Sequence, residues 1–174
     1  MSTFNTPHTE YEHCCTPVIK QESDESFVNL LCPECSAKGN SIDTQTIKSL
    51  LTVSLENVNP AVEYRFCAGE ECPVVYFAVE GGQVFQEGDL RERVYQKAAG
   101  DESVNVCYCF DITPAEIRIE LVETGSSTVA ARVDAGVKAG QCACEIRNPQ
   151  GSCCLGNVRS LVKSMTTEKV GQVI

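Results

Sequence analysis

The sequence of 174 residues contains no tryptophan, and aromatic residues make up only 6% of it. Because aromatic side chains bury the most apolar surface per residue, this composition argues against a large aromatic core. It favours small domains that are stabilised in part by something other than hydrophobic burial. With 43% hydrophobic and 22% charged residues, the chain still has the composition of a folded protein rather than a disordered one.

Basic residues are also few relative to acidic ones, 14 against 24, which gives a formal net charge of -10. Phosphate backbones are bound by basic surfaces, so nucleic acid is excluded as a partner, whereas docking on a basic protein surface is compatible with this charge. No run approaches the ~18 consecutive apolar residues of a membrane-spanning helix. The N-terminal stretch "MSTFNTPHTEYEHCC" has no basic region followed by an apolar run, as a secretory signal would. We therefore expect a cytoplasmic protein without a membrane span.

Residues for acid-base and hydrolytic catalysis are few. The chain has two histidines, His8 and His13, both near the N-terminus. The sequence shows no Ser-His-Asp set, no phosphate-binding loop and no carboxylate pair that suggests hydrolysis. Whether the protein is an enzyme is left open, and an electron-transfer or metal-binding role is favoured.

Cysteine is the abundant residue, with 12 copies. Without an export signal the thiols stay reduced, so closely spaced cysteines predict metal binding before disulfides. A disulfide framework is the alternative, if an export signal has been trimmed from the sequence. The cysteines occupy positions 14, 15, 32, 35, 67, 72, 107, 109, 142, 144, 153 and 154.

The character of the sequence changes along the chain, and we predict an α+β protein in three parts. Residues 1–27 are polar and acidic and are interpreted as a flexible tail. Residues 28–98 are interpreted as a β-rich zinc-binding domain and residues 104–166 as a small helical domain, with a polar linker over 98–105.

Within the β-rich part, residues 49–57 and 63–67 have the composition of strands. Residues 73–90 predict a hairpin whose turn is Gly81-Gly82. Residues 88–99 predict a short helix with Asp89 as its N-cap.

In the helical part, "TPAEIRIELVETG" has Thr113 as N-cap, Pro114 at the first helical position, Glu116 three residues after the cap and Gly125 as the stop signal. A second helix is predicted within 126–140 and is followed by Gly140. A third helix is predicted over 154–165. The apolar residues expected on the buried faces are Ile117, Leu121, Val122, Val158, Leu161, Val162 and Met165.

Two cysteine pairs in the β-rich part have the spacing of a structural zinc site. "CPEC" carries Cys32 and Cys35, and "FCAGEEC" carries Cys67 and Cys72 with four residues between the two sulfurs. Four thiolates fill a tetrahedral zinc site completely and leave no position for a substrate. A thioredoxin-like redox C-x-x-C is the alternative, but that motif needs a helix after it, and "SAKGNS" is a poor helix start.

A second cysteine set surrounds the predicted helices. Cys107 and Cys109 form a C-x-C pair before the first helix, and the remaining cysteines lie in "QCACEIRNPQGSCC" before the last one. A two-iron, two-sulfur cluster with four thiolates is an anion, and helix N-termini stabilise anions. We therefore predict a 2Fe-2S cluster with two helix N-termini directed at it. A second zinc site is the alternative.

Taken together, "CPECS", "FCAGEECPVVYF", "VCYC" and "CEIRNPQGSCC" resemble the N-terminal region of CopZ-type copper chaperones, over about residues 30–165. In that family a zinc-binding β unit precedes a 2Fe-2S domain like bacterioferritin-associated ferredoxin. The resemblance implies zinc at the first two cysteine pairs. It implies cluster ligands at Cys107, Cys109, Cys144 and Cys154, with Cys153 and Cys142 as alternatives for the downstream ligands.

The resemblance implies a one-electron redox protein linked to copper or another soft metal, which reduces Cu(II) to Cu(I). Its partners would be the metal ion and a redox or copper-transport protein. The M-x-C-x-x-C motif of the family's copper-binding domain is absent from these 174 residues. One alternative is a soft-metal delivery module that uses His13, Cys14 and Cys15, since thiolates favour soft ions. The other is a ferredoxin partner of a larger oxidoreductase.

Overall fold

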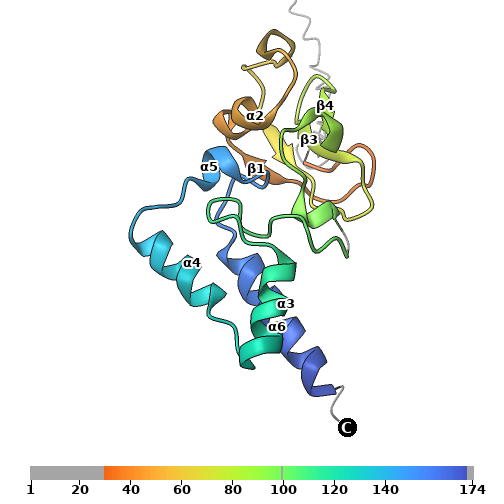
Figure 1. The fold of residues 1–174 in the computed structure, drawn as a ribbon. Helices are drawn as coiled ribbons and strands as arrows, with labels where there is room; N and C mark the ends of the chain where they lie inside the picture. Colours follow the sequence, from red (N-terminus) through yellow and green to blue (C-terminus); the bar gives the residue numbers. More distant parts are fainter. Residues whose placement is uncertain (1–29, 99, 172–174) are drawn as a thin grey trace, which may run out of the picture.

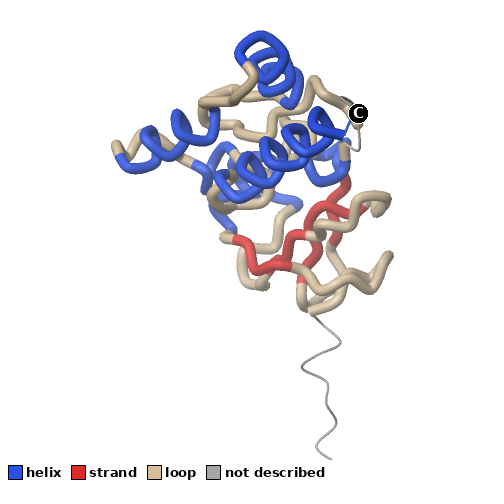
Figure 2. The backbone as a smooth tube through the Cα atoms, turned by 90° about the horizontal axis from the view of Figure 1, so that it is seen from below, coloured by secondary structure: helices blue, strands red, loops and turns tan. Residues whose placement is uncertain are grey.

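The fold is that of a computed structural model, which describes residues 30–98 and 100–171. Its strands gather at one end and its three longest helices at the other (Figures 1 and 2). The protein is α+β, as predicted. The two ends are not separate bodies, because the short helix α5 (Cys144–Arg147) packs against α2 (Thr44–Leu50) beside the sheet (Figure 1).

Four antiparallel strands form a meander in the order β1-β2-β3-β4. The strands are β1 (Asn40–Ile42), β2 (Tyr64–Phe66), β3 (Val74–Ala78) and β4 (Val84–Gln86). The first four residues of β3 are buried, as expected of a central strand that is covered on both faces.

The predicted hairpin is confirmed. β3 pairs with β4, and the connecting turn places Gly81 and Gly82 at φ 85° and 68°. Both values lie in the left-handed region that L-residues rarely adopt, which is why two glycines occupy this turn.

The strand predicted over 49–57 is wrong. The chain there is the end of α2 followed by a turn of 3-10 helix, η1 (Leu55–Asn57). Asp43 begins α2 because its carboxylate accepts the Gln45 N–H at 2.7 Å, which is an N-cap. The apolar run at 50–53 resembled a strand, but the cap and the helical spacing of buried Ile47 and Leu50 decide the local structure.

The helix predicted over 88–99 is also wrong. Two short 3-10 turns lie in this region, η2 (Glu87–Asp89) and η3 (Tyr95–Lys97). Asp89 is the last residue of η2, and its carboxylate accepts the Gln86 N–H at 2.8 Å, so it belongs to the capping box of η2 and is not the N-cap of a following helix. The next residue, Leu90, forms an antiparallel β-bridge with Leu51, so the backbone here pairs with a distant segment instead of forming a helix.

The helical predictions are confirmed in α3 (Pro114–Thr124), α4 (Val129–Lys138) and α6 (Leu155–Gly171). The Thr113 hydroxyl accepts the Glu116 N–H at 3.3 Å at the start of α3.

Helix α3 ends at Gly125, which lies at φ 80°. Both α3 and α4 pack on α6. Val122 was wrongly assigned to the buried face, since it is 68% exposed; it lies about 100° around the helix from buried Leu121.

The core is divided into three groups of buried side chains. One lies on the sheet around Tyr64 and Tyr76, and a second lies between the helices and includes Cys107 and Cys154. The third is small and consists of Cys32, Cys67, Cys72, Val74 and Phe77. Cysteines therefore occupy core positions in both halves of the molecule.

Gly39 lies where a larger residue would press on the third group. A Cβ atom at this position would lie 2.5 Å from Cζ of Phe77 and 2.7 Å from Cβ of Arg65. Because Phe77 is buried and overpacking forces side chains out of their rotamers, Gly39→Ala is expected to lower the free energy of unfolding by about 1–3 kcal/mol. Urea denaturation of the zinc-loaded chain measures this. In the control Gly88→Ala the new Cβ meets open space, and an equal loss there would contradict the steric explanation.

Candidate metal centres

The four cysteines of the β-rich half form one compact group, which we call the four-thiol group: Cys32, Cys35, Cys67 and Cys72. All four sulfurs lie within 4.8 Å of one another. Two pairs are closer, Cys32 with Cys72 at 3.7 Å and Cys35 with Cys67 at 3.5 Å. A zinc ion with Zn–S bonds of about 2.3 Å holds its sulfurs about 3.8 Å apart, so the group fits a tetrahedral zinc ion.

Two tight turns build this group. In the first, the Ser36 N–H donates to the Cys32 carbonyl at 2.9 Å, and the Cys32 N–H donates to Ala37 at 2.8 Å. Ser36 adopts φ 58°, which folds the chain back so that both sulfurs of the C-x-x-C pair face the same side.

The second turn links β2 to β3. Cys67 directly follows β2, and its N–H donates to the Val75 carbonyl at 2.9 Å. Cys72 lies just before β3, and its N–H donates to Gly69 at 3.3 Å. The sheet therefore fixes where this loop begins and ends, and the loop accommodates the four intervening residues by turning at Gly69.

Backbone amides donate hydrogen bonds to the sulfurs of this group. The Ala37 N–H lowers the pKa of the exposed Cys35 thiol to about 7. Burial raises the pKa of Cys67 to about 12 and raises that of Cys72, and amides of the following residues act against this rise. Without metal, Cys35 thus ionises before Cys67 and Cys72, and a metal must displace protons from these two.

Lys97 is a cation beside this group. Its Nζ donates to the Gly69 carbonyl at 2.8 Å and to the Cys72 carbonyl at 2.9 Å, and its charge lowers the pKa of Cys67. Since zinc with four thiolates carries a net charge of about -2, this ammonium group offsets part of the charge.

The second set of cysteines contains two close sulfur pairs, which we call the paired-thiol group: Cys107, Cys109, Cys144 and Cys154. The Cys107 and Cys154 sulfurs lie 2.8 Å apart, and the Cys109 and Cys144 sulfurs lie 3.7 Å apart. In the described part of the chain, only the four-thiol group has all its sulfurs within 4.8 Å of one another. Two separate pairs are what two metal ions that each take two thiolates require. The 3.7 Å separation of Cys109 and Cys144 is that of two thiolates on one ion, whereas the Cys107 and Cys154 sulfurs, at 2.8 Å, must move apart for both to bind one ion.

Amide groups from turns surround the Cys107 sulfur. The N–H groups of Cys109 and Phe110 donate to Cys107. Together with the hydrogen bond from Cys154, which is the largest cause, they lower the pKa of Cys107 to about 7. The same contact raises the pKa of Cys154. Within this buried pair Cys107 is therefore the thiol that ionises first.

The other pair receives amide hydrogen bonds as well. The Ala143 N–H donates to the Cys109 sulfur at 3.3 Å, and the Cys154 N–H donates to Cys144. Burial is the main cause that raises the pKa of Cys144 to about 12. Amide donors at sulfur stabilise thiolates, so this arrangement suits an anionic cluster.

The predicted role of the two helix N-termini is corrected for α3. The Ala115 N–H donates to the Glu102 carbonyl at 3.2 Å, and the Glu116 N–H donates to the Thr113 hydroxyl. These first amides of the helix are therefore engaged away from the sulfurs, and the donors lie in the 109–110 turn and at Ala143, the N-cap of α5, instead. Helix α6 does begin at the group, because the Val158 N–H donates to the Cys154 carbonyl at 3.0 Å.

The alternatives considered from sequence do not take part in these sulfur pairs within the described residues. Cys153 is exposed and Cys142 is half-buried, and within the described ranges neither has a hydrogen-bonded sulfur partner. His13, Cys14 and Cys15 lie outside the described residues. The structure thus pairs Cys107 with Cys154 and Cys109 with Cys144.

Two residues near the metal centres were missed from sequence. Lys97 carries no signal, because it lies 25 residues after Cys72 in a segment interpreted as a helix. Tyr108 did carry one, its position as the single residue between Cys107 and Cys109, and its hydroxyl contacts the backbone of Arg93 and Tyr95.

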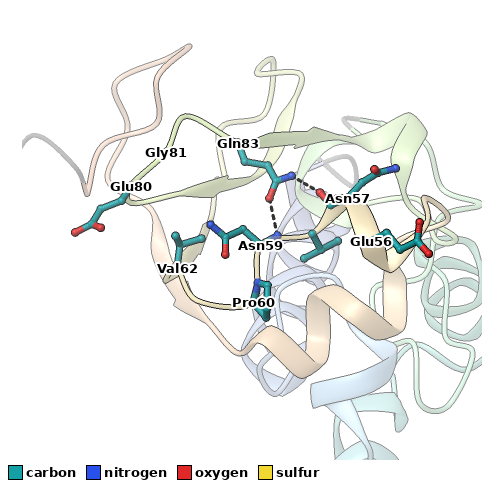
Figure 3. Close-up of a pocket in the computed structure, with 9 residues that line it drawn as sticks. Glu56, Asn57, Asn59, Pro60, Val62, Glu80, Gly81 and Gln83 are labelled. Carbon is teal, nitrogen blue, oxygen red and sulfur yellow. Dashed lines mark hydrogen bonds between the residues drawn. The ribbon is translucent and has the colours of Figure 1, made fainter.

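A hollow of about 350 Å³ lies between the 56–62 segment and the β3-β4 turn (Figure 3). The Gln83 side chain crosses it, donating to the Asn57 carbonyl and accepting the Asn59 N–H. Glu56 and Glu80 point outward at opposite ends (Figure 3). The hollow contains no thiol, and its polar contacts fasten a loop, so it is not the metal centre.

Within the described ranges, no helix combines the length and the apolar character needed to cross a bilayer.

Known proteins resemble this chain in its cysteine-bearing parts. Residues 29–91 match the family described as a zinc binding domain, of the CopZ type. Over 123 residues the chain is 32% identical to the copper chaperone CopZ of Archaeoglobus fulgidus. The matched region covers 71% of this chain and 57% of that protein. The chain therefore spans less than two thirds of the length of that relative.

The fold agrees with this similarity. The X-ray structure of the Archaeoglobus fulgidus CopZ N-terminal domain matches with a TM-score of 0.61 at 28% identity, covering 75% of this chain and 96% of that one. Residues 29–91, which include the four-cysteine group, thus resemble the CopZ-type zinc binding domain, and the likeness to CopZ extends beyond them.

Proposed function

We propose that the protein binds zinc in the four-thiol group and a 2Fe-2S cluster in the paired-thiol group, and that it transfers single electrons in copper handling. Cys32, Cys35, Cys67 and Cys72 would hold the zinc ion. Cys107, Cys109, Cys144 and Cys154 would hold the cluster.

The observation that carries the proposal is the difference between the two cysteine groups. One is compact enough for a single tetrahedral ion, and the other consists of two close pairs, at 2.8 Å and 3.7 Å, in a wider arrangement. In both groups the sulfurs accept backbone amide hydrogen bonds, which stabilise thiolates. The donor sets therefore fit a zinc ion and a two-iron cluster, respectively.

The residues around the paired-thiol group have different proposed roles. When bound, the cluster supplies one-electron redox chemistry. The amides of Cys109, Phe110 and Ala143 hold negative charge at the sulfurs, and burial of Cys107 and Cys154 keeps water away from that pair. Half-buried Cys109 leaves one side of the group near the surface, where an electron can enter or leave.

Copper handling is supported by the relative whose name states it, the copper chaperone CopZ. Reduction of Cu(II) to Cu(I) takes one electron, which matches the capacity of one two-iron cluster. Cu(I) is a soft ion that thiolate ligands favour. The acceptor is therefore proposed to be Cu(II), with a copper-transport protein as the onward partner.

Anaerobically purified protein is expected to contain about two iron and two sulfide ions per chain, together with one zinc ion. Dithionite should bleach its visible absorption with the uptake of one electron and produce an EPR signal. The reduced protein should then yield one Cu(I) per cluster from Cu(II), measured with a Cu(I)-specific chelator. A colourless protein without sulfide would overturn the cluster, and a reduced protein that leaves Cu(II) unchanged would overturn the copper role.

A further inference from the structure

The side chain of Tyr108 ties the C-x-C segment to the zinc-binding half of the molecule. Its hydroxyl donates to the Arg93 carbonyl at 2.7 Å and accepts the Tyr95 N–H at 2.9 Å. Tyr108 is only 5% exposed. Because Tyr108 lies between Cys107 and Cys109 in sequence, these two hydrogen bonds fix the backbone from which both sulfurs project.

The segment that holds Tyr108 is itself fastened to the zinc loop. Tyr95 begins the 3-10 turn η3, and Lys97 ends it. The Lys97 ammonium group donates to the carbonyls of Gly69 and Cys72. A continuous path of hydrogen bonds and one short turn therefore runs from the four-thiol group to the paired-thiol group.

A second contact supports the other side of the paired-thiol group. The Tyr76 hydroxyl, from the central strand β3, donates to the Pro149 carbonyl at 2.8 Å in a buried position. Pro149 lies in the segment that leads to Cys154, where the buried Asn148 side chain closes the turn by donating to Ser152 at 2.7 Å. Both segments of the paired-thiol group thus rest on the zinc-binding half.

Zinc bound in the four-thiol group would hold the loop that Lys97 contacts. Cys32, Cys67 and Cys72 make up most of the small core beside it, and without metal their mutual contacts are weak sulfur contacts. The folding free energy of such units comes largely from the metal, so removing zinc loosens Gly69 and Cys72. The anchor of η3, and with it the position of Tyr108, then loosens as well.

We infer that zinc in the four-thiol group and the arrangement of the paired-thiol group are coupled through Lys97 and Tyr108, which act as positioning residues for the cluster ligands. This deepens the proposed function and rests on it only for the identity of the cluster. Coupling is reciprocal, so filling the paired-thiol group also tightens zinc binding.

The test uses the full chain loaded with one equivalent of zinc and no iron, and it follows labelling of Cys107 by an alkylating reagent with mass spectrometry. Removing zinc is expected to speed the labelling about tenfold, within the 5–150-fold range of typical couplings between sites. Tyr108→Phe, which lacks the hydroxyl, should label about as fast with zinc as without it, while its zinc content stays at one. Lys97→Met should behave in the same way.

Two matched variants serve as controls. Tyr95→Phe removes a hydroxyl that makes no hydrogen bond to a described residue, and Lys138→Met removes an exposed lysine on α4. Both should keep the tenfold response. The coupling is overturned if zinc removal changes the wild-type labelling rate by less than about twofold, or if Tyr108→Phe keeps the full response.

The coupling and the proposed function fail in different measurements. Labelling that responds to zinc in a protein that never holds iron would refute the cluster and keep the coupling. In protein that does hold the cluster, Tyr108→Phe should lose its visible absorption about tenfold faster than wild type or Tyr95→Phe. Equal rates of loss would refute the positioning role and leave the proposed function intact.

Discussion

A Cys67→Ser variant is expected to bind zinc on the order of a thousandfold more weakly than the wild-type chain. Zinc binding to four-ligand finger sites supplies about 10–16 kcal/mol, so the loss of one of four thiolates costs roughly 4 kcal/mol. The Cys67 thiol is fully buried, so the serine hydroxyl that replaces it also lacks solvent access. Competition with a chromophoric zinc chelator measures the affinity, and far-UV circular dichroism reports how much of the fold remains.

The control for this variant is Cys153→Ser, which removes an exposed thiol outside the four-thiol group. It should bind zinc as wild type does. A Cys67→Ser affinity within about tenfold of wild type would show that the free energy of zinc binding does not depend on four thiolates.

The second large effect concerns two adjacent cysteines. Cys154→Ser is expected to reduce the iron and sulfide content to less than about a tenth of wild type, whereas Cys153→Ser should keep both. The reason is their placement: the Cys154 sulfur lies 2.8 Å from that of Cys107, and Cys153 is exposed. Iron and sulfide analysis after anaerobic purification checks the pair.

The comparison is well controlled because both variants make the same chemical change one residue apart, directly before α6. Cluster loss in Cys153→Ser with retention in Cys154→Ser would reverse the ligand assignment. Retention in both would move the fourth ligand to another residue, with Cys142 as the next candidate, because it is separated from Cys144 by one residue.

Local signals in the sequence predicted the elements that depend on local chemistry. Two glycines at 81 and 82 favour a tight turn, and Thr113 and Gly125 favour the start and the end of a helix. Each of these signals acts within a few residues. The hairpin and α3 were therefore predicted correctly. The failure at 88–99 arose where pairing between distant residues, Leu51 with Leu90, decides the structure. The failure at 49–57 has a local cause, because the Asp43 cap that starts α2 lies outside that segment.

In the candidate metal centres, too, features set by local sequence were predicted and features set by the fold were not. Cysteine spacing alone grouped Cys32 with Cys35 and Cys67 with Cys72, and the fold brings these pairs together through the β2-β3 loop. Spacing did not reveal which amides donate to sulfur. It suggested the N-terminus of α3, whereas one donor is the amide of Ala143, the N-cap residue of the short helix α5. The positions of such donors depend on how the turns fold against the sheet.

The order of the cysteines along the chain has a consequence for synthesis on the ribosome. The four-thiol group is complete once Cys72 has been made, while the paired-thiol group waits for Cys154, about 80 residues later. At ~5–20 residues per second the interval is roughly 4–16 s, and N-terminal units fold first during synthesis. The zinc-binding half can thus close around its ion while the later thiols are still being translated. The scaffold that receives Tyr108 and Pro149 would then exist before an iron-sulfur donor meets a complete set of ligands.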